Sequence, residues 1–268
     1  MVSLKFKYTV LLAATAAALS LPLQSAKATN GYFQSGYGAS SKGLAGAGVA
    51  LSLDSMAAAT NPAAMVHVGN RVDVEVGAFM PDREISGDGT VSSRYESINK
   101  LFLVPQFGAN YMLDNVSSLG ITMSANGGMN TEYESNPFVN FGAGGSTGTE
   151  ATNAPTGVDL SQALLGITYA RKHGNHSFGV TPTLAMQRFK AYGLQGFEGI
   201  SSSPWHVHGN GYDYSAGYGL RIGYMGKLGE GLTIGAGLAS KMYMSRFSKY
   251  DGLFADGGSF DIPANLTA

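Results

Sequence analysis

Seven stretches of the chain alternate between apolar residues and small or polar ones, and this period of two limits the possible folds most. In residues 71–80, Val72, Val74 and Val76 alternate with charged residues and Gly, so successive side chains would point to opposite faces of a strand. An eighth strand is expected to begin near Asp261. The sequence therefore predicts an all-β, antiparallel protein with about seven or eight strands. The other six stretches are residues 101–113, 119–126, 165–170, 178–187, 214–228 and 232–241.

The composition of these stretches indicates a membrane protein rather than a soluble sheet. Only 13% of the residues are charged, against about a quarter in soluble globular proteins. The faces opposite the apolar ones carry mainly Gly, Thr and Ser, whereas a soluble sheet exposes a polar face to bulk water. Beyond the N-terminal region there is no apolar run of about 18 residues, the length of a transmembrane helix. These features favour an antiparallel transmembrane β-barrel in a Gram-negative outer membrane.

The connections between the predicted strands alternate in length. Bacterial barrels have short periplasmic turns and longer outer loops, so we expect the short connections to lie on the periplasmic side. Aromatic residues also fall near predicted strand ends, where an interfacial girdle would lie. The long connections are residues 81–100, 127–160, 189–212 and 247–259, and the short ones are 114–118, 172–176 and 229–231. The aromatic residues at strand ends are Tyr111, Tyr169, Tyr214 and Tyr243.

The N-terminus has the three parts of a cleavable signal peptide. Lys5 and Lys7 precede an apolar run at residues 9–21, and Ala26-Lys27-Ala28 provides a small-x-small cleavage site. We therefore expect residues 1–28 to be a signal peptide, with an uncleaved anchor as the alternative. An exported chain is consistent with an outer-membrane location.

Residues 29–68 are rich in Gly and Ala, which lack the side-chain volume to build a core of their own. Buried backbone amides need partners, so we expect this segment to fold as a hatch, or plug, inside the lumen of the barrel. Residues 69–268 would then form the wall. Seven strands and the start of an eighth would leave two unpaired edges in lipid, which predicts an incomplete barrel. A complete eight-stranded barrel with a short last strand is the alternative.

Several motifs resemble those of the FadL/TodX-type outer-membrane transport family. The resemblance implies a fourteen-stranded barrel with an N-terminal hatch, of which this chain would hold the N-terminal part. It also implies that ligand passes from an outer-loop groove to a pocket near the N-terminus and leaves sideways at a kinked third strand. The motifs are Gly31-Tyr32-Phe33, Gly43-Leu44-Ala45-Gly46-Ala47-Gly48, Asp54 and Asn61-Pro62-Ala63, followed by residues 128–133 and 253–265.

Two candidate sites lie in the predicted hatch. Asn61-Pro62-Ala63 would seat the hatch against the inner wall, and it also has the sequence of a helix start, with Asn as the cap and Pro at the first helical position. Phe33 matches the family's aromatic residue near the mature N-terminus and, by that resemblance, would touch a bound acyl chain. The alternative for Phe33 is a wedge between hatch and wall.

Three basic residues are expected to face the lumen, because of the alternation. Arg71, Arg221 and Lys241 lie on the predicted inward faces, and a carboxylate ligand in a confined lumen would favour a cation there. We take Arg221 and Lys241 as candidate ligand contacts. The alternative is that these cations neutralise lumen acids such as Asp73 and Glu75, as in other barrel interiors.

Other kinds of chemistry have little support in the sequence. There is no Cys, which excludes disulfides and Cys-type zinc sites, and the net charge of −1 argues against nucleic acid as a partner. Gly46-Ala47-Gly48 lacks the preceding strand of a dinucleotide-binding loop, and no G-x-S-x-G motif is present, so neither a cofactor nor an enzyme is expected. His206 and His208 could share a metal, but no acidic residue or Cys lies near them in sequence, so no metal site is expected.

The leading hypothesis is passive, hatch-gated transport of long-chain fatty acids or other hydrophobic small molecules across the outer membrane. Burial of each methylene contributes about 0.8 kcal/mol, so an apolar lumen pocket suffices for capture. We expect a monomer in contact with outer-membrane lipid and lipopolysaccharide. The alternative is a structural or adhesive barrel whose long loops, especially residues 127–160, bind surfaces.

Overall fold

The computed structural model describes residues 33–86, 94–138 and 155–268. Residues 32–268 group into one unit, and everything below concerns its described residues. The predicted signal peptide, the start of the Gly31-Tyr32-Phe33 motif and the middle of the loop at 127–160 lie outside the described residues. No helix among the described residues is both long and apolar enough to cross a bilayer.

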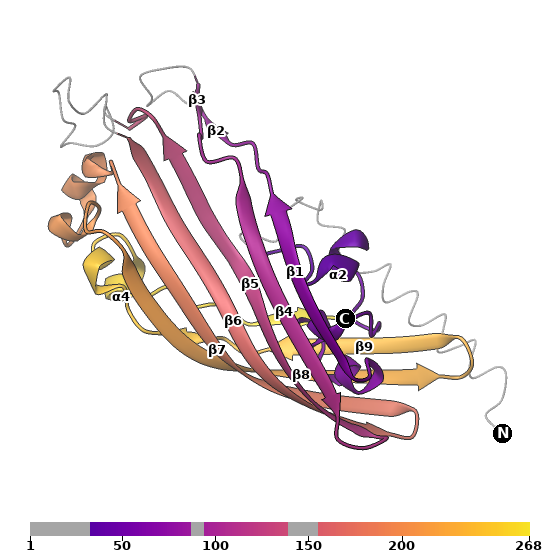
Figure 1. Cartoon of the computed structure of the whole chain (residues 1–268). Coiled ribbons are helices and arrows are strands. Elements are labelled where there is room, and N and C mark those ends of the chain that lie inside the picture. The colour runs from indigo at the N-terminus through magenta and orange to yellow at the C-terminus, as the bar shows by residue number, and fades with distance from the viewer. Residues whose placement is uncertain (1–32, 87–93, 139–154) are drawn as a thin grey trace, which may run out of the picture. The chain divides into compact units, whose positions relative to one another are not determined.

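A single antiparallel sheet dominates the structure (Figure 1). Its strands follow one another in the order β1-β4-β5-β6-β7-β8-β9-β11, and the short β10 also pairs with β8. Each main strand therefore pairs with the next one along the chain, as in a hairpin meander. The strands are β1 (Arg71–Phe79), β4 (Phe102–Met112), β5 (Ser117–Tyr133), β6 (Thr156–His173), β7 (His176–Tyr192), β8 (Asp213–Leu228), β9 (Leu232–Ala239), β10 (Tyr243–Met244) and β11 (Asn265–Thr267).

The remaining elements are short. The N-terminal segment, defined here as residues 33–70, contains α2 and the two 3-10 helices η1 and η2. The long connections carry a small β2–β3 hairpin and the other helices. These elements are α2 (Ala39–Gly43), η1 (Ser55–Ala59), η2 (Pro62–His67), β2 (Glu84–Ile85), β3 (Tyr95–Glu96), η3 (Gln195–Ile200), η4 (Pro204–His206), η5 (Ser248–Tyr250) and α4 (Ala255–Gly258).

The predicted fold class is confirmed, but three strands are longer than predicted. β5, β6 and β7 contain 17, 18 and 17 residues, and their extra residues lie towards the long connections. The alternation fades there, as in Gly127-Gly128-Met129-Asn130. This is expected where a strand leaves the apolar layer, since its outward face no longer needs apolar side chains.

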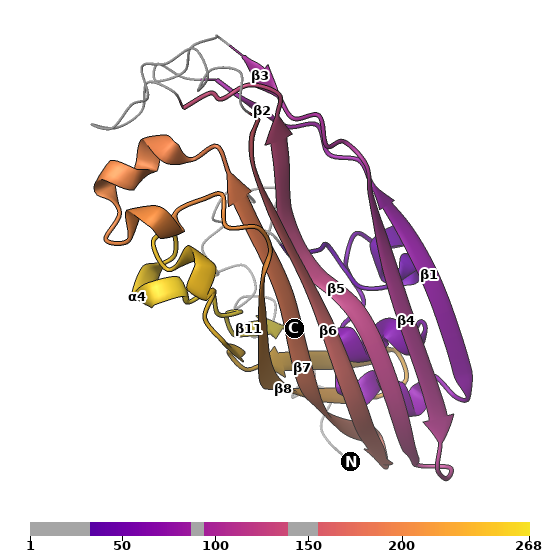
Figure 2. The same ribbon diagram turned by 60° about the vertical axis from the view of Figure 1, so that its left-hand side comes forward.

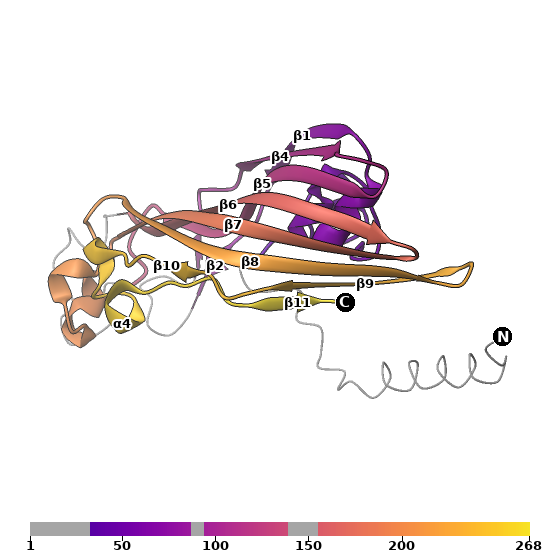
Figure 3. The same cartoon turned by 90° about the horizontal axis from the view of Figure 1, so that it is seen from below.

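The two faces of the sheet have the predicted orientation. Val72, Val74 and Val76 have exposed fractions of 66%, 74% and 66%, as lipid-facing side chains of a barrel wall would. The opposite, inner face carries buried polar side chains such as Gln106 and Thr168. The sheet curves around the N-terminal segment, which lies on this inner face (Figure 3).

Glycines on the inner face have a more specific role than the wet lumen that the sequence predicts. A Cβ added to Gly108 would lie 2.5 Å from Ser55 Oγ, and one added to Gly237 would lie 2.2 Å from the Thr60 carbonyl oxygen. Real Cβ atoms do not approach other atoms this closely. These positions are therefore small because the N-terminal segment packs directly on the backbone of the wall.

Apolar side chains gather at one end of the sheet, where the long connections meet. Phe189, Phe247 and Tyr250 are buried there, with Phe254 packed against them. The Phe189 and Phe254 ring centroids are 4.7 Å apart in an edge-to-face arrangement, which is one of the two geometries that aromatic pairs prefer. Figure 2 shows the helices of the connection after β7 beside those of the connection after β10 at this end. We call it the long-loop end and the opposite end the short-turn end.

Candidate functional site

The N-terminal segment is attached to the inner face by hydrogen bonds with wall side chains. Gly38 N donates to Gln106 Oε1 at 2.8 Å, and Ser55 donates to Asp73 Oδ2 through its backbone N at 2.9 Å and its hydroxyl at 2.6 Å. Asn110 Nδ2 donates to the Met65 carbonyl at 2.9 Å. The wall thus supplies the backbone partners that a segment rich in Gly and Ala cannot supply for itself.

The Asn61-Pro62-Ala63 motif lies at the centre of this attachment. Asn61 Oδ1 accepts from Ala63 N at 3.0 Å and caps η2, with Pro62 at the first helical position. The other side of the same amide, Nδ2, donates to the carbonyls of Val49 at 2.7 Å and Tyr224 at 2.9 Å. The motif is therefore a helix start and also a direct contact with β8.

Two wall glycines make room for this motif. A Cβ on Gly223 would lie 2.0 Å from Asn61 Oδ1, and one on Gly179 would lie 2.3 Å from the Pro62 carbonyl carbon. Neither glycine has a positive φ angle. Their small size, and not their backbone freedom, is what the contact requires.

Arg221 faces inward, as predicted, but it contacts the N-terminal segment. Its side chain is only 6% exposed, donates to the Ala59 carbonyl at the end of η1 and hydrogen-bonds the Tyr37 hydroxyl. No ion pair within the described ranges includes Arg221. Arg71, in contrast, forms an ion pair with Asp73 at 2.8 Å, which is the neutralising role given above as the alternative.

Lys241 does not face inward, and the prediction from alternation is wrong at this residue. β8 pairs Arg221 with Ala239 but Tyr218 with Tyr243, so the strand gains one residue between Ala239 and Tyr243. This bulge reverses the alternation. Met242 is buried, whereas Lys241 lies over the Tyr243 ring and pairs with Asp261 at 2.7 Å.

Phe33 lies beside an apolar cluster on the inner face. It packs against buried residues from β6, β7 and the chain around β10, and its backbone forms an isolated antiparallel bridge with Gly127 of β5. The position suits both readings of Phe33, as a contact for an apolar ligand and as a wedge against the wall. The buried members of the cluster are Leu164, Ala185, Met242, Met244 and Ile262.

β5, the third strand of the sheet, is irregular where Phe33 meets it. β6 pairs Ala163 with Ala125 but Gln162 with Gly127, so Asn126 is an extra, bulged residue. On its other side, β5 pairs with β4 only as far as Met123, opposite Phe107. Within the described ranges, the rest of β4 towards the long-loop end has no β5 partner.

The N-terminal segment occupies the backbone groups that this irregularity leaves free. Gln34 N donates to the Asn126 carbonyl at 3.3 Å, and Gln34 Nε2 donates to the Ala125 carbonyl at 2.6 Å. The resemblance implies a kinked third strand, and the structure has a bulge in that strand. The N-terminal segment therefore pairs with β5 beyond the point where β4 stops pairing with it.

A chain of polar side chains crosses the inner face from this bulge to the long connections. We call it the amide ladder, formed by Tyr37, Asn126, Gln162, Gln187 and Ser215. Its successive donor–acceptor distances are 3.1, 2.9, 2.8 and 3.2 Å. Gln187 also donates to the Phe260 carbonyl at 3.1 Å. Because the last four members are nearly fully buried, each depends on its neighbour for a hydrogen-bond partner.

The amide ladder separates two apolar regions along the strands. The aromatic cluster at the long-loop end includes Leu160 and Phe189, while the cluster beside Phe33 includes Leu164 and Ala185. Neither the amide ladder nor the aromatic cluster is predicted from the sequence. The density of Phe and Tyr in residues 245–260 is the one signal that indicates the aromatic cluster.

The two histidines of the connection after β7 contact carboxylates. His206 Nδ1 lies 2.7 Å from Asp251 Oδ1, and His208 Nε2 lies 3.0 Å from Glu198 Oε1. Asp251 is thus distant from His206 in the sequence but close to it in space. Among the described residues, no group of three or more His, Asp and Glu side chains could hold a metal ion.

No protein-family model and no curated protein matches the sequence, but several solved structures match the fold. One is a crystal structure of the toluene transporter TodX of P. putida, with a TM-score of 0.58 and 18% identity over 87% of this chain and 62% of that chain. A second is the toluene transporter TbuX of Ralstonia pickettii, with a TM-score of 0.63 and 16% identity over 87% of this chain and 66% of that chain.

A third match is CymD, a monoaromatic hydrocarbon channel, with a TM-score of 0.54 and 14% identity over 86% of this chain and 63% of that chain. The chain thus spans somewhat less than two thirds of the length of these proteins. All three are transporters or channels, and none is described as an enzyme. The fold of this chain is that of the hydrocarbon transporters, as the resemblance to FadL/TodX-type proteins predicts.

Proposed function

We propose that the chain forms part of the wall and the hatch of an outer-membrane transporter for hydrophobic small molecules. The observation that carries this proposal is the position of the N-terminal segment, which bonds to β5 through Gln34 beyond the end of the β4–β5 pairing, while Phe33 lies in the adjacent apolar cluster. In this proposal residues 29–68 are the hatch, the short turns face the periplasm and the long connections face outward.

A path for an apolar solute follows from this arrangement. The solute first meets the aromatic cluster at the long-loop end, where buried apolar contact stabilises it. It then passes the amide ladder and reaches the cluster around Phe33. A solute bound there competes with Phe33 for the same apolar contacts, so binding would favour release of Phe33 and Gln34 from β5 and would open the wall at this edge of β5.

The solute class is a hydrophobic small molecule, with long-chain fatty acids and monoaromatic hydrocarbons as the two main candidates. The solved structures that share the fold carry toluene or monoaromatic hydrocarbons according to their descriptions. Within the described residues, the inward Arg221 is occupied by Ala59 and Tyr37. This favours a neutral solute over a carboxylate at that position.

A disulfide that locks the hatch tests the proposal, because the chain has no Cys of its own. Phe33 and Gly127 are partners in an antiparallel bridge, whose Cα separation of about 4.5–5.5 Å suits a disulfide. In liposomes, the Phe33→Cys/Gly127→Cys variant should take up labelled toluene when reduced and lose uptake when oxidised. Comparing two states of one variant removes the effect of losing the Phe33 ring.

Two controls complete this experiment. The pair Val72→Cys/Ala109→Cys joins β1 and β4, which are partners in the wall, so its oxidation should leave uptake unchanged. A labelled hydrophilic sugar should not enter in any state. Equal uptake by the oxidised and reduced Phe33→Cys/Gly127→Cys variant would contradict a hatch that moves at β5.

The adhesive alternative has one observation in its favour. Trp205 and Ile200 in the connection after β7 are 85% and 71% exposed, and exposed large apolar side chains favour interaction surfaces. If the chain is an adhesin, Trp205→Ala should reduce binding of cells to a surface and leave hydrocarbon uptake intact. If the chain is a transporter, cell adhesion should not depend on Trp205.

A further inference from the structure

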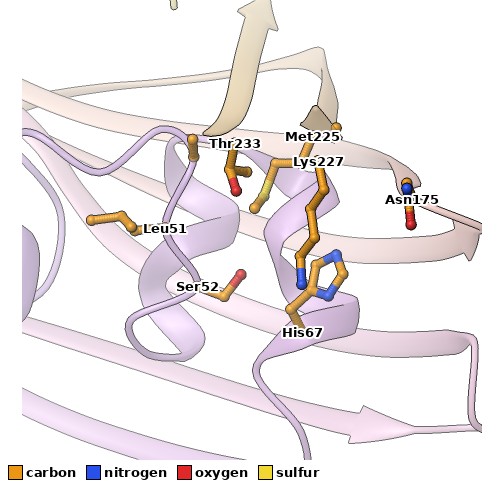
Figure 4. A pocket seen from close by; sticks show the side chains of 9 residues that line it. Leu51, Ser52, His67, Asn175, Met225, Lys227 and Thr233 are labelled. Carbon is orange, nitrogen blue, oxygen red and sulfur yellow. The ribbon is translucent and has the colours of Figure 1, made fainter. Parts of the chain in front are cut away.

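A cavity at the short-turn end lies between the N-terminal segment and the wall (Figure 4). Its volume is about 200 Å³. A cavity of about 150 Å³ is enough to hold benzene, so this one has room for a single aromatic ring with a small substituent. It is lined by Ala50, Leu51, Ser52, His67, Asn175, Met225, Gly226, Lys227 and Thr233.

The charged groups at this cavity are all basic. Lys227 of β8 extends towards the ring of His67 (Figure 4), and Lys172 of β6 also acts on that ring. No carboxylate in the described part of the chain lies within ion-pair distance of any of these three side chains. Arg71 and Lys241, in contrast, each have an acidic partner. Basic groups without a counterion around a cavity indicate a site for an anion.

Two further groups are available to an anion at the cavity. The Ser52 hydroxyl is buried and has no hydrogen-bond partner, although buried polar groups are normally paired. His67 Nε2 lies 3.1 Å from Ser177 Oγ, while Nδ1 has no hydrogen-bond partner in the described ranges. The remaining lining includes the apolar side chains of Leu51 and Met225, which suits the hydrocarbon part of an amphipathic ligand.

We propose that this cavity binds the carboxylate of a small aromatic or aliphatic acid, with Lys227 and His67 as its cationic contacts. The inference rests on the proposed function, because the cavity lies on the periplasmic side only if the short turns do. It adds a carboxylate site at the exit side of the hatch. The transporter would then deliver, or be occupied by, an acid as well as a neutral hydrocarbon.

The state of His67 supports a dependence of binding on pH. Burial lowers the pKa of this imidazole, and the charges of Lys172 and Lys227 lower it further. These two lysines, from β6 and β8, are the charged groups that act on it. A bound carboxylate opposes both effects and favours the imidazolium, so binding takes up a proton. Affinity should therefore rise as the pH falls through the range below about 6.5, the ordinary value for His.

Calorimetry on the whole chain in detergent tests the site, with benzoate as the probe and toluene and inorganic phosphate as comparators. Benzoate should bind more tightly at pH 5.5 than at pH 8, and Lys227→Gln should weaken it roughly tenfold, the effect of losing one favourable charge contact. Lys190→Gln is the matched control, because Lys190 lies at the long-loop end of β7, away from the cavity, and contacts Tyr192 and Tyr212. It should leave benzoate binding unchanged.

Three results would overturn the proposal. One is equal benzoate affinity in wild type and Lys227→Gln, and another is toluene binding at the cavity as tightly as benzoate. The third is phosphate binding as tightly as benzoate with the same loss in Lys227→Gln, which would assign the site to inorganic anions or lipid head groups. His67→Gln should abolish the pH dependence while the chain still folds. Toluene uptake by the oxidised and reduced Phe33→Cys/Gly127→Cys variant tests the proposed function separately, since neither residue lines this cavity.

Discussion

Asn61 Nδ2 donates to the carbonyl of Tyr224 at 2.9 Å, which joins two residues 163 positions apart in the sequence. The bond lies beside Gly223, where a side chain would overlap Asn61 Oδ1. One amide therefore starts η2 through its oxygen and holds η2 against β8 through its nitrogen. Secondary structure and docking of the N-terminal segment depend on the same side chain.

The two roles of Asn61 can be separated by substitution. Asn61→Asp keeps the acceptor for Ala63 N but loses both donor bonds, and it places a carboxylate beside the carbonyls of Val49 and Tyr224. Leaving buried groups unsatisfied costs about 1–3 kcal/mol each, so Asn61→Asp should loosen the segment at least as much as Asn61→Ala. Hydrogen exchange in residues 55–67 measures this. Exchange in Asn61→Asp equal to wild type would show that only the helix cap matters, a contribution of about 1 kcal/mol.

Gly223→Ala should displace the N-terminal segment without disturbing the strand. The added methyl would lie 2.0 Å from Asn61 Oδ1 and 2.8 Å from Pro62 Cδ, and such overpacking costs about 1–3 kcal/mol. Gly231→Ala is the control, because a Cβ there meets nothing within 4 Å. Cells with Gly223→Ala should admit a hydrophilic antibiotic faster than cells with Gly231→Ala. Identical permeability of the two would mean that the motif does not seal the wall.

Gln187 is the member of the amide ladder whose loss should cost most. Gln187→Met removes the acceptor of Gln162 Nε2 and the donor to the Phe260 carbonyl, with an expected destabilisation of about 1–3 kcal/mol for each group left unsatisfied. The temperature at which the folded form is lost on gel electrophoresis should fall. The neighbouring outward residue provides the control, since Met186→Leu changes only a half-exposed apolar side chain and should leave that temperature nearly unchanged.

The alternation of residues made the wall predictable, because each outward Val or Leu faces lipid whatever its neighbours do. The same alternation, continued past Ala239, placed Lys241 on the wrong face. A single inserted residue between Ala239 and Tyr243 reverses the two faces, and no local sequence signal marks it. The partners of Gln162, Gln187 and Arg221 were also inaccessible, since each contact joins segments that are distant in the sequence. The helix cap at Asn61 was predictable because it is local, whereas its bond to Tyr224 was not.

The contact between Asp251 and His206 should make the long connections sensitive to acid. Hydrogen bonds from His206 and Ser203 hold the pKa of the Asp251 carboxyl below its usual range. A carboxyl whose pKa is lowered in the folded state stabilises that state at pH values above its unfolded pKa of about 3.9, and this contribution is lost as the pH falls through the lower folded value. The hydrogen-exchange protection factors of residues 195–206, which correct for the intrinsic pH dependence of exchange, should therefore be steady down to about pH 4 and fall below it. Asp251→Asn should show raised exchange at neutral pH, and a flat profile in both proteins would contradict the contact.

Substitution of Arg221 distinguishes an anchor of the N-terminal segment from a ligand contact. As an anchor, its loss frees the Ala59 carbonyl and the Tyr37 hydroxyl, so Arg221→Gln should raise hydrogen exchange in residues 55–67 and change uptake of oleate and toluene by the same factor. As a carboxylate contact, its loss should impair oleate alone and leave exchange unchanged. The structure predicts the first result, because the guanidinium is only 6% exposed and its donors are directed to the N-terminal segment. Arg221→Lys keeps the charge but not the planar set of donors, so it should resemble Arg221→Gln if anchoring dominates and wild type if charge alone attracts the acid.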